Sequence, residues 1–137
     1  MESINLDILV KKLKALPIKV PIEVLTLWET SNDAWCLKTI EGSIIYVNKS
    51  YYDLITPTSY HKKSALAPFS EIIRDHDSMV MHNGLKVDAV GVLSLNEGKD
   101  FKSFFCERMP FYNKLAEISG IISHIGTLKV VTPNFFI

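Results

Sequence analysis

The segment from Asn32 to Ile55 constrains the fold most, because two short apolar runs flank Gly42 and an aromatic-rich run follows them. The runs AWCLKT and SIIYV have the length and composition of strands, and a glycine between them can take the positive φ of a tight turn without steric cost. Asn48 follows the second run directly, and its side-chain oxygen can accept an N–H at a helix start. The segment therefore predicts two antiparallel strands followed by a capped helix, SYYDLI.

Two helices are predicted before this unit. Residues 4–16, INLDILVKKLKAL, place apolar side chains mostly on one side of a helix and lysines on the other, and Pro17 ends it. Pro21 is a good first residue for a second short helix, IEVLTLWETS, whose end leads into the first strand. Residues 1–20 are thus predicted to form an N-terminal amphipathic cap.

The second half of the chain predicts one long helix and three strands. Residues 69–82 have a helical apolar arc, and Asn83-Gly84 is a left-handed cap signal at its end. The runs KVDAVGVLSL and FKSFFCERM are joined by NEGKD, and SGIISHIGTLKVVT follows. Two strands, helices and then three strands predict an α+β domain with a five-stranded antiparallel sheet and helices on one face.

Charge and hydropathy exclude several partners. Fifteen basic and fifteen acidic residues cancel, without long runs of one sign, so direct binding to nucleic acid is not expected. No apolar stretch is long enough to cross a bilayer, and residues 1–16 do not have the pattern of a signal peptide. We expect a cytoplasmic protein without a membrane partner.

The order of these features resembles that of PAS sensor domains, in particular the PAS_4-like group, from about Leu25 to Thr132. The resemblance rests on the Gly42 turn, Tyr46-Val47-Asn48, His76-Asp77, Asn83-Gly84, Arg108-Met109-Pro110 and Gly120. It implies a PAS-like sheet with strand order 2-1-5-4-3, a sensory domain over residues 21–132 and a C-terminal stub or linker over 133–137. In that order the fifth strand separates the first from the fourth, so Cys36 and Cys106 are expected to remain free thiols.

The resemblance also implies a function. Such domains bind a small ligand, and the large side chains here suggest an apolar or aromatic one, whose occupancy is relayed to an effector that this chain does not contain. PAS-like domains often precede a helix-turn-helix of the LuxR type in bacterial regulators of transcription, and they often form homodimers. The N-terminal helix is then either a cap on its own domain or a dimerisation helix. Thr39 and Val130-Val131-Thr132 stand where many PAS domains have acidic residues that couple the sheet to the output.

Ten residues are predicted to line the ligand pocket on the concave face of the sheet. They are Trp35, Tyr46, Tyr51, Tyr52, His76, Met79, Phe104, Cys106, Met109 and His124. Taken one at a time, such side chains are more often ordinary core residues. As a group they suit a ligand that is held by apolar burial and oriented by one or two polar contacts.

Two of these histidines have alternative roles. His76 lies within the apolar arc of the long helix, where a haem ligand would have to be, although a lone histidine there is more often a core residue. No cofactor and no metal site is therefore predicted. For His124, strand alternation leaves both an inward, ligand-facing and an outward position open.

No catalytic constellation is present, so an enzyme is not expected. Asp75 and Asp77 flank His76, but on a helix they point about 100 degrees away from it and are expected at a solvated edge. The rival interpretations are a protein-interaction or dimerisation module with a filled core, and a ketosteroid-isomerase-like enzyme.

Overall fold

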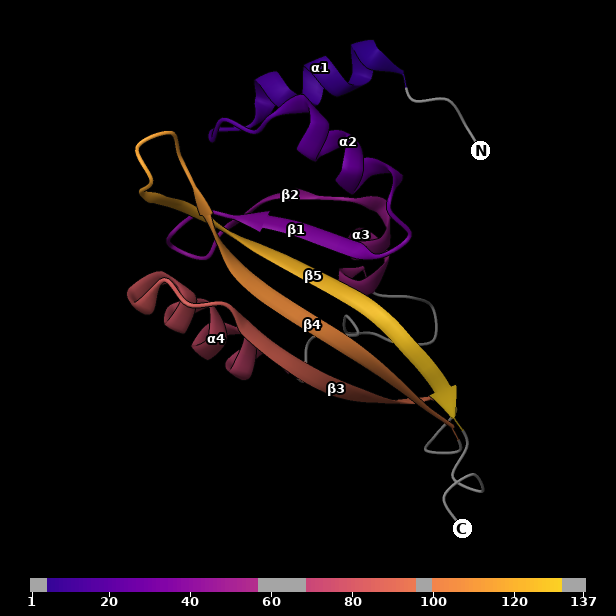
Figure 1. Ribbon diagram of the computed structural model, residues 1–137. Helices are drawn as coiled ribbons and strands as arrows, with labels where there is room; N and C mark the ends of the chain where they lie inside the picture. Colours follow the sequence, from indigo (N-terminus) through magenta and orange to yellow (C-terminus); the bar gives the residue numbers. More distant parts are fainter. Residues whose placement is uncertain (1–4, 57–68, 96–99, 132–137) are drawn as a thin grey trace.

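The computed structural model describes residues 5–56, 69–95 and 100–131, which contain four helices and five strands (Figure 1). In chain order these are α1 (Leu6–Ala15), α2 (Ile22–Thr30), β1 (Ala34–Lys38), β2 (Ile44–Val47), α3 (Lys49–Ile55), α4 (Ser70–Asn83), β3 (Val87–Leu95), β4 (Asp100–Tyr112) and β5 (Ile118–Val131). The helices predicted between Pro57 and Pro68 and the stub at 133–137 lie outside the described residues.

The five strands form one antiparallel sheet in the order β2-β1-β5-β4-β3. The predicted fold class and strand order are confirmed. Because β5 returns between β1 and β4, it joins the N-terminal hairpin to the C-terminal strands. Cys36 and Cys106 are accordingly free and buried on strands that are not neighbours.

Three predicted signals fix the corners of this fold. The Asn48 side chain is buried, accepts the backbone N–H groups of Tyr51 and Trp35, and donates to the carbonyls of Trp28 and Asp33. It therefore caps α3 and at the same time ties β1 and the end of α2 to this corner. Gly42 and Gly84 both have positive φ, in the β1–β2 turn and at the end of α4.

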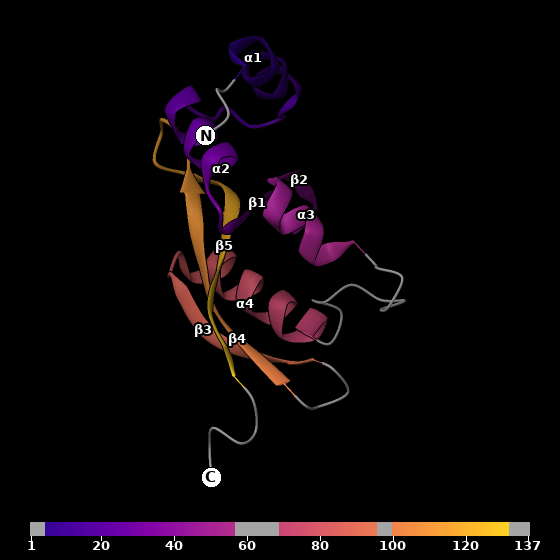
Figure 2. The ribbon, with the colours of Figure 1, turned by 90° about the vertical axis from the view of Figure 1, so that its right-hand side faces the viewer.

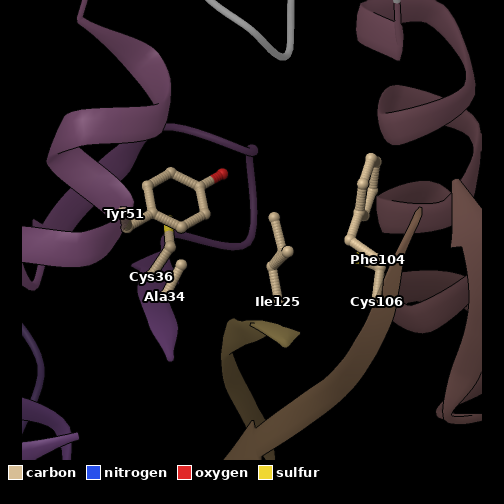
Figure 3. Packing of buried hydrophobic residues seen from close by; sticks show 6 residues of the cluster. All are labelled: Ala34, Cys36, Tyr51, Phe104, Cys106 and Ile125. Carbon is tan, nitrogen blue, oxygen red and sulfur yellow. The ribbon is translucent and has the colours of Figure 1, made fainter. Parts of the chain in front are cut away.

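The sheet buries a different apolar cluster on each of its faces. The inner face carries α3 and α4 and buries Ala34, Cys36, Tyr51, Phe104, Cys106 and Ile125 (Figures 2 and 3). The outer face carries α1 and α2 and buries Leu9, Leu25, Trp28, Leu37 and Tyr46. The N-terminal helices thus cover part of the outer face, around β1 and β2, and leave the outer face of β3 open.

Candidate ligand-binding site

The ten predicted pocket residues do not line one pocket. Tyr51, Phe104 and Cys106 lie in the inner cluster (Figure 3). Four others lie on the outer face. Tyr46 and Trp35 pack in the outer cluster, His124 stacks on Trp35, and Met109 pairs with Ile122 of that cluster. The prediction that all of them share the concave face is wrong, because directly paired residues of neighbouring strands point to the same side and these pair with outer-face residues.

The helical residues of the set are also separated. Tyr52 is exposed on α3, Met79 is exposed on α4, and His76 is only half-buried. The side of α4 that packs on the sheet instead carries Asp77 and Val80. Asp77 was expected at a solvated edge, and its burial corrects that expectation.

Asp77 is the centre of a buried ionic cluster on the inner face. Its Oδ2 accepts a hydrogen bond from Lys38 Nζ at 2.7 Å, and its Oδ1 lies 3.1 Å from Arg108 Nε. The side chains of Lys38 and Arg108 are only 6% and 3% exposed, so water screens them little. The cluster joins α4 to both β1 and β4.

Sequence reasoning did not find this cluster. Arg108 belongs to the family pattern Arg108-Met109-Pro110, and Lys38 lies near the end of the predicted strand AWCLKT. The available signal was two basic residues at positions that alternation assigns to the same face as Cys36 and Cys106.

Polar groups of the inner cluster continue from Arg108 toward α3. Arg108 Nη1 donates to Cys106 Sγ at 2.8 Å. Burial raises the pKa of the Cys36 thiol to about 11, and burial also raises the pKa of the neighbouring Tyr51 hydroxyl. Both groups therefore stay protonated near neutral pH. Ser123 pairs with Cys36 and with Arg108 across the sheet, and its fully buried hydroxyl has no hydrogen-bond partner among the described residues.

A pocket of about 440 Å³ adjoins the ionic cluster between α4 and the β1–β2 turn. Lys38 and Asp77 form part of its wall, together with Arg74 and His82 of α4 and Glu41 of the turn. Its apolar lining comes from Ile40, Ile73, Met81 and Ile121.

A second polar group lies on the outer face. His124 Nε2 lies 2.8 Å from Asp33 Oδ2, its Nδ1 lies 3.9 Å from Glu107 Oε1, and its ring stacks on Trp35 with centroids 4.2 Å apart. This resolves the orientation that the sequence left open: His124 points outward. It therefore does not contact the 440 Å³ pocket.

The described residues contain no group of three His, Cys, Asp or Glu side chains that could hold a metal ion. Within the same ranges, each helix is too short or too polar to cross a membrane.

No protein-family model matches the chain, and no curated protein does. Solved structures do match. The phage VqmA–DPO complex has a TM-score of 0.63 at 17% identity, and the match covers 78% of this chain and 52% of the other. The Vibrio cholerae VqmA dimer, described as a LuxR-type receptor in the absence of its target DNA, has a TM-score of 0.61 at 17% identity over 80% of this chain and 52% of that chain.

A PAS domain from Colwellia psychrerythraea is matched over 94% of its length and 77% of this chain, with a TM-score of 0.53 at 16% identity. The chain therefore has the PAS fold, which is a fold of sensory domains. It spans about half the length of the VqmA chains.

Proposed function

We propose that this chain is a PAS-type sensory domain that binds a small molecule on the inner face of its sheet and relays occupancy to an effector. The observation that carries the proposal is the 440 Å³ pocket, whose wall includes buried, charged side chains between α4 and the sheet. Ligand pockets of this size usually combine apolar walls with a few oriented polar groups. The pocket has both.

The fold supports a sensor that is not an enzyme. The two VqmA structures and the Colwellia domain have the same fold, and one of the VqmA structures is a complex with DPO. By analogy with VqmA, the effector is a DNA-binding part of a transcriptional regulator that acts in the cytoplasm. A ligand can drive such an output only if it binds one arrangement of the domain more tightly than another.

A homodimer is part of this proposal. Leu6 and Ile8 of α1 are exposed, although Leu9 on the same helix is buried in the outer cluster. The helix thus serves as a cap and still presents an apolar edge that a second copy could cover. Light scattering of the wild type and of Leu6→Glu separates a dimer that uses this edge from a monomer.

The sensor is tested by native mass spectrometry of the purified chain and by a thermal-shift screen of small metabolites, both apolar and charged. A co-purified molecule, or a compound that raises the melting temperature in a dose-dependent manner, supports the proposal. If no molecule is retained and no compound stabilises the chain, the sensor proposal is wrong.

A protein-interaction module is the second candidate. It is favoured by the two buried apolar clusters and by the uncovered apolar side chains Val90 and Val92 on the outer face of β3. Failure of every ligand in the screen, combined with a stable dimer, would select it.

A further inference from the structure

We propose that the 440 Å³ pocket binds a small organic acid, whose carboxylate contacts Lys38 and whose apolar body lies against Ile73, Met81 and Ile121. This inference rests on the proposed sensory function and names the chemical class of its ligand.

The first argument is the charge of the buried cluster. Lys38 and Arg108 are both almost fully buried, and within the described residues Asp77 is the one carboxylate within ion-pair distance of either. The sequence between α3 and α4, residues 57–68, contains neither Asp nor Glu. Among the described residues the cluster therefore has one positive charge in excess, and an uncompensated buried charge is unfavourable unless a counter-charge arrives.

The second argument identifies the cation that is left over. Arg108 does not border the pocket; it contacts Asp77 from the sheet side and so balances that carboxylate. Lys38 does border the pocket, and one of its three N–H groups is used by Asp77 Oδ2. Within the described ranges, the excess charge and the remaining N–H donors of Lys38 are thus at the pocket wall.

The third argument is the balance of donors and acceptors. Among the described residues, Lys38 Nζ has one hydrogen bond, to Asp77 Oδ2, and it lies at the pocket wall, whereas the unpaired Arg108 Nε and Ser123 hydroxyl belong to residues that do not border the pocket. In the part of the chain that the structure describes, the one buried carboxylate oxygen without a hydrogen bond in this region is Asp77 Oδ1. It forms an ion pair with Arg108 Nε that lacks hydrogen-bond geometry. An ionised carboxylate only accepts hydrogen bonds, so it complements the remaining N–H donors of Lys38 at the pocket wall.

The pocket also limits the size and charge of the acid. Its volume suits a compact molecule, and its apolar walls suit a body without further charges. On its rim, exposed Arg74 is offset by exposed Glu41. A single excess charge at Lys38 therefore favours a monocarboxylate over a dicarboxylate.

The test compares acids with their neutral amides on the full chain at constant ionic strength. Benzoate, phenylacetate and 4-methylpentanoate are each paired with the corresponding amide, and binding is measured by calorimetry and thermal shift at pH 7. We expect at least one acid to bind and to raise the melting temperature, and its amide to bind about ten- to one hundred-fold more weakly, because a charge-assisted hydrogen bond is lost.

Variants locate the site. Lys38→Met should weaken binding of the acid by a similar factor, whereas Lys38→Arg, which keeps the charge, should retain most of it. Lys49→Met is the matched control, because Lys49 is exposed on α3 and, among the described residues, pairs with Asp53 alone.

Each outcome is decisive. If Lys38→Met binds the acid as tightly as the wild type, or if amides bind as well as acids, the inference is wrong. If only neutral compounds of the wider screen bind, the inference is wrong and the sensor stands. If no compound of any class binds, both proposals fail.

Discussion

Removal of the Asp77 carboxylate tests the buried ionic cluster directly. In Asp77→Asn, two buried cations lose their shared counter-charge. At an effective dielectric constant of about 20, opposite unit charges attract by about 6 kcal/mol at the 2.7 Å of the Lys38 contact and by about 5 kcal/mol at the 3.1 Å of the Arg108 contact. Desolvation of the ions offsets much of this attraction, and loss of one partner from a buried pair costs about 3–5 kcal/mol. We therefore expect Asp77→Asn to lower the free energy of unfolding by about 3–5 kcal/mol.

The opposite change should behave differently. Lys38→Met leaves Asp77 and Arg108 as a balanced pair and replaces a buried ammonium with an apolar side chain of similar length. We expect its free energy of unfolding to lie within about 1 kcal/mol of the wild type, since apolar replacement of a buried ion is often neutral or stabilising. If this change is tolerated, stability does not require the Lys38 ammonium.

Urea unfolding at pH 7, followed by emission of Trp28 and Trp35, measures both variants. A loss of 3–5 kcal/mol lowers the urea midpoint by at least about 1 M. Asp75→Asn is the control, because Asp75 is exposed on the same helix and should change stability by less than about 0.5 kcal/mol. A loss below about 1 kcal/mol for Asp77→Asn, or an equal loss for Lys38→Met, would refute the charge argument.

Three further predictions concern the core. Gly91→Ala places a Cβ 2.3 Å from the Phe104 ring and should lower the free energy of unfolding by about 1–3 kcal/mol. Gly126→Ala, whose new Cβ would lie 3.6 Å from its nearest neighbour, should be tolerated, and melting temperatures compare the two variants. Asn48→Ala removes four hydrogen bonds at a buried corner and should lower the unfolding free energy by about 2–4 kcal/mol in urea, a value that an unchanged midpoint would contradict. The pKa of the Cys36 thiol is raised to about 11 in the folded chain, so the unfolded chain loses this proton at lower pH. The free energy of unfolding should therefore fall as pH rises from about 9 toward 11. For the same reason, Cys36 in the native protein at pH 8 should resist alkylation by iodoacetamide.

Local signals were sufficient to predict the helices, the strands and the turns between them. Asn48 after a strand, Gly42 in a turn and Gly84 after a helix each act on a few neighbouring residues, and the structure uses all three as predicted. The order of strands was not a local signal; it came from the resemblance to PAS domains. Together these two sources gave the correct sheet.

The faces of α4 could not be assigned from the sequence. Ile72, His76 and Met79 make an apolar arc about as well as Ile73, Asp77 and Val80 do, and hydrophobicity favours the first because the second contains a carboxylate. The structure buries the second, since Asp77 meets cations that come from strands 39 and 31 residues away along the chain. A helix wheel contains no information on such distant partners.

The strands presented a related difficulty. Alternation distinguishes the two faces of a strand only when one of them is polar. In β1, Trp35 and Leu37 pack on the outer cluster while Cys36 belongs to the inner one, so both faces are buried. Large aromatic residues were therefore assigned to a pocket that they do not reach. Lys38 was the signal that strand alternation did provide. A charged residue on the inner side of a strand that is covered on both faces needs a partner, and that partner is Asp77, which borders the pocket together with Lys38.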